Sequence, residues 1–156
     1  MSPQFDFKKL QRFITIYAVV QVVLILLLVY VAASFQGGFQ MAGYPQRFFH
    51  SIILSLLIQL ALFYPIWKFA GSEATREVNA SEVGLGADKL KAMRTRRTIG
   101  DVVKSGVFVF FITFILKAPN NDLVRSVIYF TFILTILSYF QCFNFAAKRE
   151  MKQRLS

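Results

Sequence analysis

Long apolar segments alternate with short polar ones along this chain, and the alternation predicts four membrane-spanning helices. The segments cover approximately residues 13–35, 48–70, 102–118 and 123–147. The first would form a helix about 34 Å long, which is enough to cross the roughly 30 Å hydrocarbon core of a bilayer. A helix also satisfies its backbone hydrogen bonds internally, as lipid requires. We therefore expect an all-α integral membrane protein whose single membrane domain takes up residues 1–156.

Short polar connections pair these segments into hairpins. Glycines and a proline in "QGGFQMAGYPQ", residues 36–46, predict a tight surface connection between the first two spans. Pro119 ends the third span, and Asp122 is a candidate N-cap for the fourth. The third span reaches membrane length only if Lys104 extends its amino group toward the lipid headgroups. We expect two antiparallel hairpins joined by a loop over residues 71–101.

The first span has a second interpretation, as a cleaved signal peptide. Lys8, Lys9 and Arg12 precede it, and "VAAS" at residues 31–34 resembles a cleavage site. The apolar stretch is longer than the roughly 7 to 15 residues of a signal-peptide core, so we expect a retained transmembrane helix.

Basic residues gather on one side of the predicted spans. Residues 1–12 hold three of them, residues 68–104 hold eight and residues 148–154 hold four, so that fifteen of the 18 lie on one side. The positive-inside rule assigns this side to the cytoplasm. Both termini and the 71–101 loop are therefore expected to be cytoplasmic, in a bacterial inner membrane or a plasma membrane.

Composition supports the membrane assignment and narrows the chemistry. The chain is 56% hydrophobic, with 18 phenylalanines, one cysteine and one histidine. With Cys142 and His50 alone, it offers no disulfide, no haem-ligand pair and no clustered metal ligands, so we expect no cofactor and no metal. The net charge of +10 flanks the apolar spans, which favours a bilayer with an anionic inner leaflet as partner over nucleic acid.

Reactive residues are missing from the predicted spans. All eight carboxylates fall outside the spans or at their ends, whereas proton- or cation-coupled transport usually uses an acid inside the membrane. His50 and Ser51 are adjacent, but successive helix positions point about 100° apart, so they do not form a base and nucleophile by themselves. We therefore expect a protein without enzymatic activity.

Polar residues form stripes on two of the predicted helices. Ser and Gln side chains recur every four residues in the second span, and small polar residues recur at spacings of four, three and four in the fourth. Gln21 in the first span lies near the same depth as Gln59, and we expect the two amides to hydrogen-bond. The stripes favour a helix-packing seam, with a substrate or ion path as the alternative. The residues concerned are Gln21, Ser51, Ser55, Gln59, Thr131, Thr135, Ser138 and Cys142.

Charge is segregated within the 71–101 loop. Its first part is acidic, and "KLKAMRTRRT", residues 89–98, is almost purely basic. The basic part can form a helix capped by Asp88 that lies on the inner leaflet. A solvated helix that only sets the topology is the alternative, and a third is docking of the acidic part on a cytoplasmic partner. The candidate lipid contacts are Lys89, Lys91, Arg94, Arg96, Arg97 and Lys104.

The third predicted span is bulky on every side, which suits either lipid or a large apolar partner. Its phenylalanines are Phe108, Phe110, Phe111 and Phe114. We expect a non-catalytic accessory, assembly or regulatory subunit of a larger membrane complex, which contacts a protein partner or itself within the membrane. The alternative is an oligomeric small transporter or channel protomer lined by the polar stripes of the second and fourth spans. A lipid-modifying enzyme would need reactive residues from a partner chain.

Overall fold

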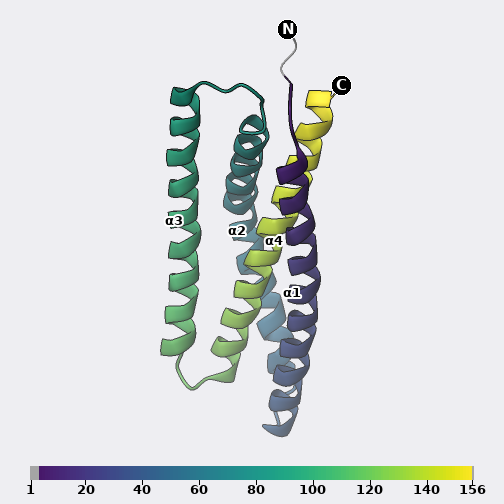
Figure 1. The fold of residues 1–156 in the computed structure, drawn as a ribbon. Helices are drawn as coiled ribbons and strands as arrows, with labels where there is room; N and C mark the ends of the chain where they lie inside the picture. The colour runs from purple at the N-terminus through teal and green to yellow at the C-terminus, as the bar shows by residue number, and fades with distance from the viewer. Residues whose placement is uncertain (1–3, 156) are drawn as a thin grey trace.

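The computed structural model describes residues 4–155 and consists of four long helices (Figure 1). In chain order they are α1 (Lys8–Met41), α2 (Gln46–Asn79), α3 (Ala87–Lys117) and α4 (Asp122–Leu155). All four are long and apolar enough to cross a membrane. The prediction of an all-helical protein with four candidate spans is confirmed.

The helices extend well beyond the predicted spans. At 34 residues each, α1, α2 and α4 are about 51 Å long, which exceeds the roughly 30 Å hydrocarbon core of a bilayer. The segment expected between the second and third spans, residues 71–101, is therefore mostly helical, because only residues 80–86 connect α2 to α3. Charged and alanine residues favour a helix as strongly as apolar ones do, so the helix does not end where hydrophobicity ends.

The basic segment belongs to one continuous helix with the third span. Residues 89–98 form the first turns of α3, and no break separates them from the apolar part. The basic segment is helical, as predicted, but Asp88 is the second residue of α3 and not its cap, and a position on the leaflet stays a prediction. The chain turns instead at Gly84, whose φ of 87° is one that other residues rarely adopt, and α3 begins after Gly86.

Tight connections join the helices at the opposite end of the bundle. Gly43, with φ of 77°, turns the chain between α1 and α2. The N-cap of α4 is Asn121, because its side-chain oxygen accepts a 3.0 Å hydrogen bond from the backbone N–H of Leu123. Asp122, the expected cap, is the first residue of the helix.

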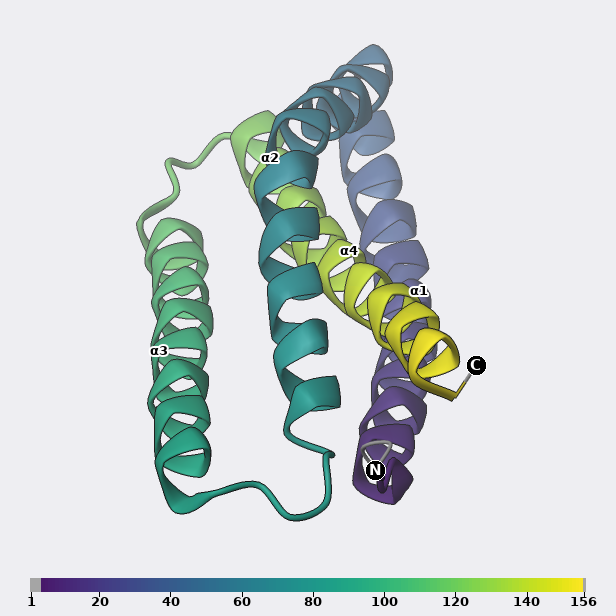
Figure 2. The same ribbon diagram turned by 90° about the horizontal axis from the view of Figure 1, so that it is seen from above.

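Helix α4 occupies the centre of the arrangement. It packs most extensively against α2, which has the same chain direction and which it crosses obliquely, and next against α1, whereas α3 stands to one side (Figures 1 and 2). Figure 2 shows that α2 bends along its length, and Pro65 inside this helix supplies the cause by removing a backbone donor. The main packing therefore joins the two hairpins to each other.

Two apolar clusters lie at opposite ends of the bundle. The larger joins α1, α2 and α4, where small residues such as Ala70, Ala74 and Ala147 are fully buried and allow the helices to approach closely. The smaller consists of Phe39, Phe48 and Phe130. Each cluster contains residues of α1, α2 and α4, so the three helices pack together at both ends.

Polar side chains fill the α2–α4 interface between these clusters. The Ser55 hydroxyl donates to the backbone oxygen of Ser51 over 2.7 Å and lies 3.5 Å from that of Val127 in α4. Gln59 donates from Nε2 to the Ser138 hydroxyl over 2.8 Å, and the Thr135 hydroxyl donates to Gln59 Oε1 over 3.3 Å. We call this interface the polar seam.

The polar seam corrects the predicted partner of Gln59. Its amide bonds to α4 and not to Gln21, because α1 and α2 make few contacts while α4 lies along both of them. Gln21 is half-buried on α1, and no side-chain hydrogen bond of the described residues involves it.

Residues 4–6 and the end of α4 meet the last residues of α2 and the α2–α3 connection at one end of the bundle. The backbone N–H of Asp6 donates to Ser81 over 2.9 Å, and that of Val83 donates to Gln4 over 2.8 Å. Near the end of α4, Arg154 donates to the Asn79 side chain over 2.9 Å. Because fifteen of the 18 lysines and arginines belong to this half of the molecule, we call it the basic end.

Replacing Gln59 with leucine should lower the free energy of unfolding by about 1–2 kcal/mol, because an interhelical bond in a membrane protein contributes roughly 0.6 to 2 kcal/mol. Gln21→Leu makes the same chemical change at a position outside the seam and should be close to neutral. Denaturation of the detergent-solubilised protein measures both. An equal loss in Gln21→Leu, with no further loss in the double variant, would instead show that Gln59 bonds to Gln21.

Candidate functional site: a charged cluster at the basic end

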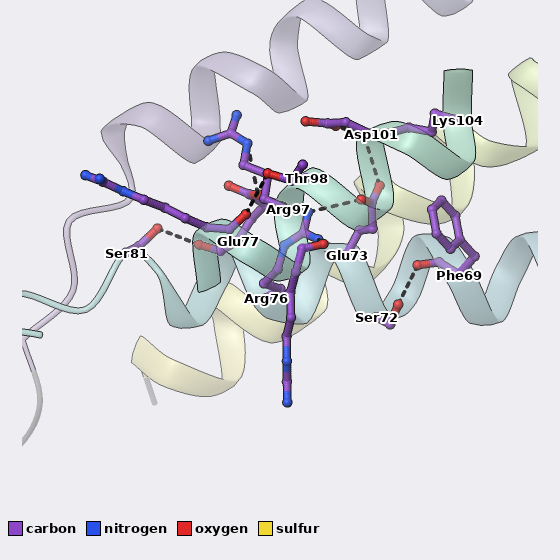
Figure 3. A network of polar contacts seen from close by, with 12 residues as sticks. Phe69, Ser72, Glu73, Arg76, Glu77, Ser81, Arg97, Thr98, Asp101 and Lys104 are labelled. Carbon is purple, nitrogen blue, oxygen red and sulfur yellow. Dashed lines mark hydrogen bonds and ion pairs between the residues drawn. The ribbon is translucent and has the colours of Figure 1, made fainter. Parts of the chain in front are cut away.

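Acidic and basic side chains of α2 and α3 face one another where the helices leave the apolar segments (Figure 3). On α2, Glu73, Arg76 and Glu77 follow the spacing that places three residues on one helix face. On α3, Arg97, Asp101 and Lys104 do the same. Tyr139 of α4 completes the group, which we call the charged cluster.

Glu73 is the centre of the charged cluster. Its side chain is only 3% exposed, and its two oxygens accept bonds from three helices. Arg76 Nη2 lies 3.0 Å from Oε1, Lys104 Nζ lies 3.2 Å from Oε2, and the Tyr139 hydroxyl donates to Oε2. The Lys104 ammonium also lies 5.9 Å from the centre of the Tyr139 ring. A buried carboxylate needs such pairing, because desolvation of an isolated charge costs several kcal/mol.

Arg76 extends the cluster to the backbone of α3. Its Nη1 donates to the main-chain oxygen of Arg96 over 2.9 Å, while Nη2 also lies 3.3 Å from a Glu77 oxygen. Its Nε has no hydrogen-bond partner among the described residues. One guanidinium therefore holds together two carboxylates of α2 and a carbonyl of α3.

Gly100 allows α3 to come this close. A Cβ at this position would overlap with Oε1 of Glu73 and would lie 3.2 Å from Arg76 Nη1. The glycine is thus required by a close approach of two helices, not by its own backbone conformation. Gly106 lies six residues further along α3, and a Cβ built there has no atom within 4 Å.

The outer members of the cluster are exposed and contribute less. Arg97 is 45% exposed, with its Nε 4.0 Å from Glu77, and Asp101 is 59% exposed, with an oxygen 2.9 Å from Lys104. Exposed ion pairs are generally worth 0 to about 1 kcal/mol. Most of the stability that the cluster contributes therefore comes from Glu73 and its three donors.

Apolar contacts of α3 are limited by comparison. Within α3, only Gly100 and Phe111 are buried. Phe111 packs against Phe132 of α4 with ring centres 5.0 Å apart, and Phe108 meets the same ring edge-on at 5.7 Å. The charged cluster and this phenylalanine group hold α3 to the bundle.

The basic residues expected to meet lipid take four different positions in the structure. Arg97 and Lys104 belong to the charged cluster, whereas Arg94 lines a cavity beside it. Arg96 supplies its backbone oxygen to Arg76. Lys89 and Lys91 are exposed in the first turns of α3.

The stripe residues of α4 also divide. Thr135 and Ser138 join the polar seam, but Thr131 is buried with its hydroxyl unpartnered. Cys142 packs in the larger apolar cluster with Phe143, away from the seam. The structure therefore brings together Ser51, Ser55, Gln59, Thr135 and Ser138, and leaves Gln21, Thr131 and Cys142 outside this hydrogen-bonded group.

Sequence reasoning missed Glu73 as a buried group. The apolar segment ends near Ala70, which places the acid outside the predicted span, whereas α2 continues to Asn79, about two and a half turns beyond Ala70. One signal was present: Glu73, Arg76 and Glu77 have helical spacing, and no proline interrupts residues 66–118. The lysine and tyrosine that meet Glu73 come from other helices and leave no local signal.

Two cavities adjoin the charged cluster. The smaller, of about 80 Å³, reaches Glu73, Lys104, Tyr139 and Tyr17. The larger, of about 240 Å³, lies between α1, α2 and the first turns of α3. Within residues 4–155, no group of three or more histidine, cysteine, aspartate or glutamate residues is arranged to hold a metal ion.

No protein-family model, curated protein or solved structure matches this chain in comparisons with known proteins. The interpretation of the site therefore depends on its own geometry.

Glu73→Gln and Lys104→Met should each destabilise the protein, with Glu73→Gln costing about 3 kcal/mol because it leaves the partly buried Arg76 and Lys104 without their counter-charge. The double variant should lose less than the sum, since it removes both members of the pair. Unfolding in detergent gives the coupling energy, with Glu82→Gln in the α2–α3 connection as the control. Strictly additive losses would show that the pair does not stabilise the fold.

Gly100→Ala should lower the unfolding temperature, because the new methyl group displaces the Glu73 carboxylate. Gly106→Ala should leave it unchanged or raise it, since alanine is favoured over glycine by up to about 1 kcal/mol in a helix. Thermal unfolding of the two variants side by side makes the comparison. A similar change in both would mean that α3 does not approach α2 closely at Gly100.

Proposed function

We propose that this protein is a non-catalytic integral membrane protein that serves as an accessory, assembly or regulatory subunit of a larger membrane complex. The observation that carries the proposal is the position of α3. This helix has few contacts with α2 and α4, and most of its apolar side chains are exposed, which leaves them to other molecules.

The outward surface of α3 differs in kind from that of α1. On α1 the exposed side chains over the apolar segment are mostly valine, isoleucine and leucine. On α3 they include Phe108, Phe110 and Phe114, all about half exposed. Aromatic residues are enriched in protein interfaces, where they bury a large rigid area. The proposed partner is therefore a transmembrane helix of another protein that packs on α3.

The polar seam supports a structural role for the residues inside the bundle. Gln59, Thr135 and Ser138 hydrogen-bond one another, and Ser55 bonds within the same interface. Polar groups that satisfy one another across two helices stabilise association, as expected for a packing seam. A path for a substrate would need these groups to face an open route.

We also propose that the basic end faces the cytoplasm, in a bacterial inner membrane or a plasma membrane. The distribution of lysine and arginine supports this orientation through the positive-inside rule. The meeting of both chain ends and the α2–α3 connection at one end of the bundle is compatible with it.

A transporter or channel protomer is the second candidate, and Glu73 is the observation in its favour. Buried carboxylates in membrane proteins often carry protons or cations, and this one adjoins a cavity of about 80 Å³. Against it, Arg76 and Lys104 already balance the charge of the carboxylate. The charge balance at Glu73 therefore favours the subunit role over a transporter or channel.

A photo-cross-linking amino acid at Phe110 tests the proposal in native membranes. Position 26 on α1 is the matched control, because Leu26 is 65% exposed and Phe110 is 55% exposed. We expect a discrete adduct with one other membrane protein from position 110 and none with that protein from position 26. The absence of any protein adduct from position 110 would contradict the subunit role. An adduct only with a second copy of this chain would also contradict it and would favour the oligomeric transporter.

A further inference from the structure

The larger cavity at the basic end has the features of a binding site. Its volume of about 240 Å³ far exceeds the roughly 15 Å³ that one water molecule needs. Three helices contribute to its walls: the first turns of α1, the last turns of α2 and the first turns of α3. It therefore exists only because α2 and α3 extend beyond the apolar segments.

The charge of the lining is predominantly positive. Lys9, Arg76, Arg94 and Arg97 line the cavity, with Glu77 as the one carboxylate among its described lining residues. Arg76 forms an ion pair with Glu77 within the charged cluster, and Arg97 Nε lies 4.0 Å from the same carboxylate. No ion pair of residues 4–155 includes the side chains of Lys9 or Arg94, which leaves two cations for a ligand.

The remaining walls are apolar. Phe13, Leu90 and Met93 line the same cavity from α1 and α3. The ammonium of Lys9 and the guanidinium of Arg97 lie 6.0 Å and 5.9 Å from the centre of the Phe13 ring, so the cationic and apolar parts adjoin. A ligand that carries an anionic group next to hydrocarbon would match this lining.

The cavity also lies at the edge of the apolar segments, where a membrane-spanning bundle would meet the lipid headgroups. Phe13 is the first residue of the first apolar segment, and Lys9 precedes it by one helical turn. Basic pockets between transmembrane helices on the cytoplasmic side bind the headgroups of anionic phospholipids. Arginine in particular can give a phosphate two parallel hydrogen bonds.

We propose that this cavity binds the phosphate group of an anionic phospholipid from the inner leaflet, with Lys9 and Arg94 as the principal ligands. The lipid would enter between α1 and α3, and its phosphate would offset the positive charge of the lining. This site differs from general adhesion to the leaflet, since Lys89 and Lys91 on the same helix lie outside the cavity. It does not depend on the proposed subunit role, although the choice of the inner leaflet rests on the proposed orientation.

Native mass spectrometry of the full-length protein in mild detergent tests the site with phosphatidylglycerol, and with phosphatidylcholine as the zwitterionic comparison. We expect phosphatidylglycerol to bind in preference, and Arg94→Gln and Lys9→Gln each to weaken it about tenfold. Lys91→Gln removes an equal charge from α3 outside the cavity and should change the affinity less than twofold. Unfolding temperatures close to that of the unaltered protein would show that the variants are folded.

Equal weakening by Arg94→Gln and Lys91→Gln would overturn the proposal, because it would mean that charge acts only through the general surface. Equal binding of the two lipids would overturn it as well. A separate arm titrates inorganic phosphate against the delipidated protein. Saturable phosphate binding that depends on Arg94, without any preference for phosphatidylglycerol, would assign the cavity to a soluble phosphate compound and reject the lipid.

Discussion

A carboxylate removed from water is stable only when charges and hydrogen bonds replace its hydration, and the arrangement of α3 depends on how Glu73 meets this requirement. The replacement comes from Arg76 on α2, Lys104 on α3 and Tyr139 on α4. Since these donors come from three helices, the full set of bonds to Glu73 forms only when the three helices lie together. The carboxylate therefore links α3, which has the fewest packing contacts, to the other helices of the bundle.

The other helices are held by different means. Helices α1, α2 and α4 share an apolar cluster rich in alanine, and α2 and α4 also share the polar seam. Apolar burial gives little net attraction within lipid, so small residues and interhelical hydrogen bonds determine which helices associate. Helix α3 has few of either, which explains why ionic contacts matter most where it meets α2.

Sequence reasoning located the helices well and their contacts poorly. Apolar windows identify the segments that lipid can accept, and all four candidate spans are confirmed. The same windows cannot show where a helix ends in water, so the last turns of α2 and the first turns of α3 fall within the predicted connection between spans. The stripes predicted that Gln59 would need a partner, but choosing between Gln21 and the α4 hydroxyls requires the relative position of helices distant in sequence. Glu73 was missed for the same reason, since its lysine and tyrosine donors lie on helices far along the chain.

The most direct test of the central claim measures the separation of α3 from α2 with and without the Glu73 charge. Spin labels at positions 60 and 116, which are exposed on α2 and α3, report this distance by double electron–electron resonance in a Cys142→Ala background. We predict a single narrow distance distribution for the otherwise unaltered protein and a broad, longer one for Glu73→Gln. An unchanged distribution in Glu73→Gln would contradict the account, because the position of α3 would then not depend on the Glu73 charge.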